Sequence, residues 1–242
     1  MGILSLKGIR KQYNGQEVLN IDSLTITKGE IHGYLGRNGA GKSTTIKIIM
    51  GIIPADEGTI EFQGKVIDYR DPSYKQYIGY CPDYPAVFEN LTLLEHLHFM
   101  AHLYGVKDFT LLKEKINKLL ADFEMEKYRN TPIKQLSRGN KQKVAIIASV
   151  IHDPLLLVYD EPTLGLDPVA LKKFKVFLKE FTNTGGTVFI SSHLLNVLEE
   201  VADSVSIIKD GRIIKKNIPV QVIHSTLTGM EEFLLAAVEE GD

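Results

Sequence analysis

The sequence predicts an α/β protein in which helices cover a mostly parallel sheet. Two observations lead to this expectation: strand and helix patterns alternate over residues 155–214, and a glycine-rich loop near residue 40 stands between a strand pattern and a helix pattern. Repeated strand–helix units favour parallel strands, because each connecting helix packs back onto the sheet. We also expect an N-terminal antiparallel β subdomain and an inserted α-helical subdomain.

The N-terminal part is expected to be rich in strands. Residues 3–30 alternate apolar and polar positions around a turn at Asn14 and Gly15, which predicts a hairpin or small sheet. Residues 30–36 (EIHGYLG) indicate a buried strand, and residues 42–51 indicate a helix. Further strand signal occupies 59–67.

The middle of the chain changes character. Residues 88–130 contain two helical patterns, LTLLEHLHFMAHLYG and TLLKEKINKLLADFEM, whose apolar residues recur three and four positions apart. No strand signal interrupts them, so we expect a helical subdomain. Strand and helix patterns then alternate at 155–160, 169–181, 187–192, 194–202 and 204–214.

Composition excludes several classes of protein. The chain has 242 residues, 44% of them hydrophobic, and a net charge of -2, which provides no general attraction to nucleic acid or anionic lipid. Cys81 is the single cysteine, so no internal disulfide is possible and a reducing, cytosolic setting is favoured. No apolar run approaches the roughly 18–20 residues of a membrane span, and the N-terminus lacks the pattern of a signal peptide.

The loop GRNGAGKST, residues 36–44, fits the pattern G-x-x-x-x-G-K-[ST]. Its glycines let successive backbone N–H groups turn inward around an anion, and the following helix adds the positive end of its dipole. Lys42 is placed to reach the β- and γ-phosphates, and the Ser43 hydroxyl to ligate Mg²⁺. The alternative is an ordinary glycine-rich turn. The expected nucleotide-binding residues here are Gly36, Arg37, Asn38, Gly39, Ala40, Gly41, Lys42, Ser43 and Thr44.

A pair of acids follows an apolar strand in LLLVYDEP, residues 155–162. The strand delivers Asp160 and Glu161 at its carboxyl end, the edge at which doubly wound sheets bind their ligands. Asp160 suits the binding of Mg²⁺, directly or through one of its ligands, and Glu161 suits a general base that orients or activates water. The alternative is two acids that merely cap the turn at Pro162.

Two further motifs are weak when each is taken alone. FISSH, residues 189–193, ends an apolar strand with His193, which can hydrogen-bond a γ-phosphate, although a lone histidine is usually structural. LSRGNKQK, residues 136–143, places Ser137 and Gly139 at the start of an apolar helix, where backbone amides point outward. In isolation, an ordinary N-cap is the better interpretation.

In this order, the four motifs resemble those of the nucleotide-binding subunits of ABC transporters, over about residues 3–215. By this resemblance GRNGAGKST is Walker A, LLLVYDEP is Walker B with its catalytic glutamate, LSRGN is the signature motif and His193 is the switch histidine. TLGLD is similar to the D-loop and supplies Asp167. The resemblance also implies that Tyr13 stacks on adenine and that Val18 packs beside it.

The resemblance implies a P-loop NTPase core that binds ATP and Mg²⁺. In the family two subunits meet head to tail, and ATP lies between Walker A of one and the signature of the other. We therefore expect ATP hydrolysis, a second ATP-binding subunit, a separate membrane permease, and a peripheral position on the cytoplasmic face of the membrane. The expected domains are the core at 1–87 and 136–215, the helical subdomain at 88–135, and a C-terminal helical tail at 216–242.

The sequence departs from the family pattern in three places. Arg138 and Asn140 replace a glycine and a glutamine of the signature. Asp83 occupies the Q-loop position in place of glutamine or glutamate, and we expect it to contact Mg²⁺ or water, directly or through a water. Leu164 stands in the D-loop where a small polar residue is common.

The helical segment indicates the type of transporter. LTLLEHLHFMAHLYG is similar to a pattern found in exporters of the ABC-2 type, and LSRGNKQK resembles signature variants of that group. A zinc site at His96, His98 and His102 is a weaker interpretation, because no cysteine lies near them in the sequence. A soluble ABC ATPase without transport, or a nucleotide-binding switch that hydrolyses weakly, remains the alternative function.

Overall fold

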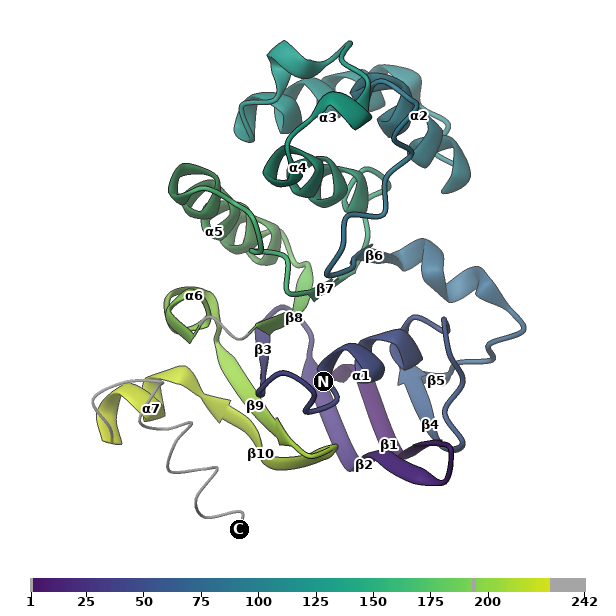
Figure 1. Ribbon diagram of the computed structural model, residues 1–242, viewed down its shortest axis with the longest axis vertical. Coiled ribbons are helices and arrows are strands. Elements are labelled where there is room, and N and C mark those ends of the chain that lie inside the picture. Colours follow the sequence, from purple (N-terminus) through teal and green to yellow (C-terminus); the bar gives the residue numbers. More distant parts are fainter. Residues whose placement is uncertain (1, 193–194, 227–242) are drawn as a thin grey trace.

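The computed structural model describes residues 2–192 and 195–226, and within these it contains two sheets (Figure 1). One is antiparallel with the order β2-β1-β4-β5, and the other has the order β10-β9-β3-β8-β7-β6. In the second sheet β9, β3, β8, β7 and β6 are parallel, and β10 runs antiparallel at the edge. The strands are β1 (Gly2–Tyr13), β2 (Gln16–Thr27), β3 (Ile31–Leu35), β4 (Glu57–Phe62), β5 (Lys65–Val66), β6 (Ile78–Cys81), β7 (Leu156–Asp160), β8 (Thr187–Ser192), β9 (Ser204–Lys209) and β10 (Arg212–Pro219). The α/β class and the antiparallel N-terminal sheet confirm the prediction from the sequence.

Helices cover both faces of the larger sheet. The α-helices are α1 (Lys42–Ile49), α2 (Leu93–Leu103), α3 (Phe109–Asp122), α4 (Arg138–Ser149), α5 (Pro168–Asn183), α6 (Leu195–Val201) and α7 (Val220–Thr226). Short 3-10 helices occur at η1 (Pro72–Tyr77), η2 (Glu126–Tyr128) and η3 (Ile133–Gln135). In the described ranges, no helix is long and apolar enough to cross a bilayer.

The alternation of side chains along each central strand creates two separate cores. On β3, Ile31 and Leu35 belong to a cluster formed with the helices α2 to α6, whereas Tyr34 belongs to a cluster formed with α1 and the antiparallel sheet. This follows from the period of two residues in a strand, which sends neighbouring side chains to opposite faces. Helix α1 and the loop before it therefore lie on one defined face of the sheet.

Helices α2, α3 and α4 gather at one end of the molecule, at the top of Figure 1. Thr92 and Glu95 form a reciprocal capping box at the start of α2, and the Asp108 side chain caps α3. Helix α4 begins after the range 88–135 but packs against α2 and against β6. The apolar faces of these helices continue the core that covers the sheet.

Two strands differ from the sequence expectation. β6 has only four residues, and Gly79 weakens its strand signal, yet a Cβ at Gly79 would lie 2.1 Å from the carbonyl oxygen of Ser149 in α4. β10 continues to Pro219, so residues 216–219 are strand rather than part of a helical tail. Ile218 packs against the core and holds this extension in place. Residues 227–242, the rest of the expected tail, lie outside the described residues.

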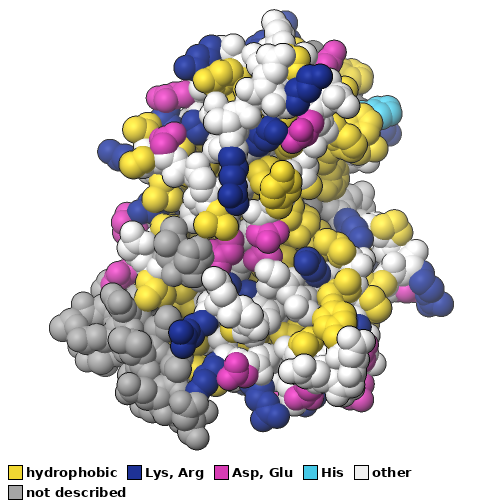
Figure 2. Space-filling view, viewed as in Figure 1, with side chains coloured by type: hydrophobic (Ala, Val, Ile, Leu, Met, Phe, Trp, Pro, Cys, Tyr) yellow, Lys and Arg dark blue, Asp and Glu magenta, His cyan; other side chains and the backbone are white. Residues whose placement is uncertain are grey.

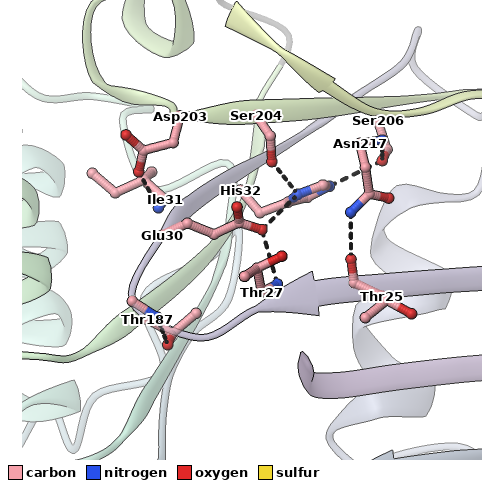
Figure 3. Close-up of polar contacts among 11 residues, drawn as sticks. Thr25, Thr27, Glu30, Ile31, His32, Thr187, Asp203, Ser204, Ser206 and Asn217 are labelled. Carbon is pink, nitrogen blue, oxygen red and sulfur yellow. Dashed lines mark hydrogen bonds and ion pairs between the residues drawn. The ribbon is translucent and has the colours of Figure 1, made fainter. Parts of the chain in front are cut away.

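A buried polar network joins the two sheets (Figure 3). The His32 ring on β3 is fully buried and hydrogen-bonds the hydroxyls of Ser204 at 2.8 Å and Ser206 at 3.0 Å, both on β9. Asn217 of β10 donates its backbone N–H to the Ser206 hydroxyl and its side-chain amide to the carbonyl of Thr25 on β2. Satisfied polar groups of this kind fix strand register where apolar contacts alone would not.

Candidate functional site

The glycine-rich loop lies between β3 and α1, at the carboxyl end of the parallel strand. Gly36 is in close contact with β9, because a Cβ there would lie 2.5 Å from the carbonyl oxygen of Ile208. Gly41 precedes α1 with φ of +109°, a backbone conformation that residues with a side chain rarely adopt. The backbone of this loop therefore requires glycine at these positions, which explains the motif in steric terms.

Lys42 begins α1, and its side chain turns back under the loop. Its ammonium donates hydrogen bonds to the carbonyl oxygens of Gly36 at 2.6 Å and Arg37 at 3.3 Å. It also lies 3.4 Å from Oε1 of Glu161, with both side chains 10% exposed or less. The cation is thus held at the floor of the loop, where backbone N–H groups and the helix dipole also favour an anion.

Asp160 ends β7 and is 1% exposed. Its Oδ1 accepts a hydrogen bond from the Ser191 hydroxyl at 2.6 Å, and its Oδ2 has no hydrogen-bond partner among the described residues. Burial raises the pKa of Asp160, the hydroxyls of Ser191 and Ser43 lower it, and the charges of Asp83 and Glu161 raise it further. A buried carboxylate oxygen without a partner fits a hard cation that takes oxygen ligands.

Glu161 follows directly and has a left-handed backbone with φ of 49°. Its backbone N–H donates to the Ser191 carbonyl oxygen at 3.2 Å and to the Ser191 hydroxyl at 3.1 Å. This turn places the two adjacent acids differently: Asp160 faces the Ser43 side of the sheet, and Glu161 lies beside Lys42.

Lys42 and Glu161 open onto a cavity of about 620 Å³, and Asp160 lies behind it. Tyr13 and Val18 from the antiparallel sheet, Asp83 after β6 and Leu164 after β7 join the loop in lining it. On the side of the molecule that Figure 2 shows, acidic side chains lie at mid-height, between the helices α2 to α4 and the strands. The lining residues are Tyr13, Val18, Arg37, Asn38, Gly39, Gly41, Lys42, Ser43, Thr44, Asp83, Glu161 and Leu164.

Among the predicted site residues that the structure describes, those that do not line this cavity are Gly36, Ala40, Asp160, Ser137, Gly139 and Asp167. The last three lie at or near the starts of α4 and α5. Ser137 caps α4 by accepting a hydrogen bond from the Asn140 N–H at 3.3 Å. Gly139 packs on the loop that contains Leu164, since a Cβ there would lie 2.3 Å from the Gly165 carbonyl oxygen. Asp167 caps α5 through the Ala170 N–H at 2.8 Å. His193 lies outside the described residues.

Two polar residues near the acids were not expected from the sequence. Ser191 bonds to both Asp160 and Glu161, as described above. Gln142 of α4 is 1% exposed and donates to the Pro162 carbonyl oxygen at 3.0 Å, directly after the acid pair. Neither has a local sequence signal, because each meets the acids only through the packing of a separate element.

The histidines of α2 do not form a cluster. His96 is buried and its ring lies 5.8 Å from that of Phe88, whereas His98 is exposed. In the part of the chain that the structure describes, no three histidine, cysteine or acidic side chains are grouped to hold a metal ion.

The fold and the loop define a class of protein, the P-loop nucleotide-binding proteins. Residues 19–164 match the family described as ABC transporter, and the chain belongs to this family. It is 37% identical to the ABC-type transporter ATP-binding protein EcsA of Bacillus subtilis, over 88% of this chain and 86% of that protein. It is 34% identical to the lantibiotic transport ATP-binding protein SrtF of Streptococcus pyogenes, over 88% and 89%.

The fold agrees with this assignment. A solved structure described as an ATP binding subunit of an ABC transporter superposes with a TM-score of 0.89 and 31% identity, and the match covers 98% of this chain and 99% of that one. The chain is thus an ATP-binding subunit of the ABC transporter type and an ATPase. Its relatives include the SkfA peptide export ATP-binding protein SkfE of Bacillus subtilis, to which it is 35% identical over 89% of each chain.

Proposed function

We propose that this chain hydrolyses ATP to drive export through a separate membrane permease, from a peripheral position on the cytoplasmic face of the membrane. The observation that carries the proposal is the cavity in which Lys42, Asp83 and Glu161 meet Tyr13. It combines an aromatic wall that can stack on a nucleotide base, a loop that can bind phosphates, and acids that can bind a metal ion and activate water. The name of one relative, the SkfA peptide export ATP-binding protein SkfE, supports export.

Each lining residue has a proposed role. Tyr13 stacks on adenine with Val18 beside it, and the exposed half of the Tyr13 ring is available for this contact. The N–H groups of residues 36–44 and the Lys42 ammonium hold the phosphates, which requires Lys42 to exchange its carbonyl acceptors for phosphate oxygens. Glu161 accepts a proton from the attacking water.

Three oxygen donors suit Mg²⁺: the Ser43 hydroxyl, the Asp160 carboxylate and the Asp83 carboxylate. The partnerless Oδ2 of Asp160 is the observation that fits them to this ion. When bound, Mg²⁺ neutralises charge on the phosphate oxygens. Asp83 is a shorter acid than the usual Q-loop residue, so we propose that it acts through a water.

A second ATP-binding subunit completes the site. Ser137 and Gly139 lie outside the chain's own cavity, so they are available to a nucleotide held by a partner. The start of α4 directs backbone N–H groups outward, where they favour the γ-phosphate. We propose a head-to-tail dimer in which ATP binding favours the closed state, and hydrolysis with His193 beside the γ-phosphate reopens it.

The permease is proposed to contact a groove between the sheet and the helical end. This groove has a volume of about 270 Å³ and lies close to Asp83 in the chain, so movement there can reach the nucleotide site. Its lining is mainly apolar and includes Ile52, which is 54% exposed. The groove residues that matter here are Met50, Ile52, Tyr80, Pro82, Met100 and Tyr104.

Purification from native membranes in mild detergent tests this function. We expect a multi-span membrane protein to accompany the wild-type chain, and Ile52→Glu to lose it while still hydrolysing ATP. Val66→Glu is the matched control, because Val66 is similarly exposed on the antiparallel sheet. Recovery of the wild-type chain without any membrane protein would contradict transport and favour a soluble ATPase.

A further inference from the structure

Ser191 occupies a central position in the larger sheet. In the parallel register of β8 it lies directly beside Tyr34 of β3 and directly beside Asp160 of β7. It is fully buried. Phe189, two residues earlier on β8, belongs to the core on the α1 side of the sheet. The Ser191 side chain lies on the same side, because side chains two residues apart on a strand share a face.

The Ser191 hydroxyl uses both its donor and its acceptor capacity on the acid pair. It donates to Oδ1 of Asp160 at 2.6 Å and accepts the backbone N–H of Glu161 at 3.1 Å. An ionised carboxylate only accepts hydrogen bonds and an amide N–H only donates them, so the direction of both bonds is fixed. One buried side chain therefore connects the two acids.

This connection determines where each acid points. With Oδ1 held by Ser191, rotation of the Asp160 carboxylate is restricted and Oδ2 stays without a partner among the described residues. The Glu161 backbone adopts φ of 49°, which is uncommon for a residue with a side chain. Two acceptors on Ser191, its hydroxyl and its carbonyl oxygen, hold the Glu161 N–H in this conformation.

We propose that Ser191 is a positioning residue for ATP hydrolysis, acting through Asp160 and Glu161 and not by contact with the nucleotide. Its hydroxyl keeps one oxygen of Asp160 directed toward the Ser43 side and keeps Glu161 turned toward the cavity. The inference rests on the proposed roles of Asp160 and Glu161, and it adds a residue that neither Walker motif contains.

A purely structural role predicts a different result, and Ser206 provides the comparison. Ser206 lies beside Tyr34 on the other side, in β9, and is also fully buried. Its hydroxyl likewise has two partners, the His32 ring and the Asn217 N–H, and neither belongs to the nucleotide cavity. Loss of either hydroxyl should therefore cost similar stability, but only Ser191 should affect catalysis.

The test compares Ser191→Ala, Ser191→Thr and Ser206→Ala in kcat for ATP hydrolysis, nucleotide Kd and thermal unfolding. Ser191→Ala is expected to lower kcat about tenfold or more, as the loss of a group that orients a ligand commonly does, with Kd within about threefold of wild type. Threonine keeps the hydroxyl, so Ser191→Thr is expected to recover most of this loss. Ser206→Ala is expected to keep kcat within about twofold at a similar loss of Tm. The limits of about threefold on Kd and about twofold on kcat are smaller than the fall in kcat expected when an interaction made only in the transition state is lost.

The Mg²⁺ dependence of the rate is the readout that a purely structural role would not change. The Ser191 hydroxyl holds Oδ1 of Asp160, so its removal should free the carboxylate to rotate, and the Mg²⁺ concentration for half-maximal rate should rise. Ser206→Ala should leave this concentration unchanged, because its hydroxyl bonds, among the described residues, only the His32 ring and the Asn217 N–H.

Two results would overturn the inference: an unchanged kcat and Mg²⁺ dependence in Ser191→Ala, or equal losses of kcat in Ser191→Ala and Ser206→Ala. Glu161→Gln shows whether the role of Ser191 or the proposed role of the acids is wrong. If Glu161→Gln abolishes turnover while Ser191→Ala does not, only the role of Ser191 is wrong. If Glu161→Gln leaves turnover unchanged, the assignment of the acids is wrong.

Discussion

The Lys42 ammonium lies 3.4 Å from Oε1 of Glu161, and it also donates to the Gly36 carbonyl oxygen at 2.6 Å. The cation and the acid attract each other at the floor of the cavity. Nucleotide phosphates compete for the same cation. Binding of ATP is therefore expected to separate Lys42 from Glu161 and to leave the carboxylate directed at the water.

The first prediction concerns Glu161→Gln. The amide keeps the shape of the carboxylate but cannot accept a proton, so kcat is expected to fall at least about a hundredfold, in the range for loss of a general base. Nucleotide Kd should change little, and the variant should form a stable dimer with saturating ATP and Mg²⁺, measurable by light scattering. Glu180→Gln, on α5 and outside the cavity, should behave as wild type. Monomeric Glu161→Gln under these conditions would contradict the dimer.

The second prediction concerns the aromatic wall. Tyr13→Ala is expected to weaken ATP binding by between about fivefold and about 150-fold, because stacking of an aromatic ring on a base contributes about 1–3 kcal/mol. Tyr13→Phe should keep most of the affinity. Calorimetry with inorganic tripolyphosphate provides the control, since it lacks a base: its Kd should be the same for Tyr13→Ala and wild type. Equal loss for both ligands would mean that Tyr13 shapes the loop and not the base site.

The third prediction concerns the contact between Gly139 and Gly165. A Cβ at Gly139 would lie 2.3 Å from the Gly165 carbonyl oxygen, so Gly139→Ala must displace the start of α4 or the loop before α5. We expect the ATP-dependent dimer of the Glu161→Gln background to be lost. Nucleotide binding by the single chain should persist, because Gly139 does not line the chain's own cavity. Dimer formation by the doubly substituted chain would show that the partner does not use this surface.

The fourth prediction concerns pH. Burial lowers the pKa of His96 from 6.5 to about 4, and neither ring nitrogen has a hydrogen-bond partner among the described residues. Between these values the unfolded chain binds the proton and the folded chain does not, so stability is complete above about pH 6.5 and falls as the pH decreases toward 4. Up to about 3 kcal/mol of the free energy of unfolding depends on this group.

Urea unfolding at pH 7.5 and pH 5 measures this effect. His96→Leu should be as stable as wild type or more stable at pH 7.5, because an apolar side chain removes two polar atoms that lack partners. Its stability should depend less on pH. The exposed His98 provides the control, and His98→Leu should keep the wild-type difference between the two pH values. An unchanged difference in His96→Leu would exclude His96 as its source.

Local sequence accounts for the parts of the site that one segment forms alone. The loop 36–44 is such a segment, since its glycines, lysine and hydroxyls are consecutive and the strand and helix on either side orient them. The same holds for Asp160 and Glu161 at the end of an apolar strand. β6 lacks such a local signal, because Gly79 weakens its strand pattern. The need for glycine there arises from the Ser149 carbonyl oxygen of another element.

The sequence by itself determined the fold class, the family and the phosphate-binding loop, because these depend on short-range patterns of glycine, charge and hydrophobic period. Only the tertiary structure decided which distant side chains meet. Tyr13 reaches the cavity because the antiparallel sheet packs on α1, and Ser191 reaches both acids because β8 pairs with β7 in one register. A shift of one residue in that register would turn Ser191 to the other face of the sheet, since successive side chains alternate. Local sequence thus determines which acids stand at the site, whereas strand pairing determines how they are oriented.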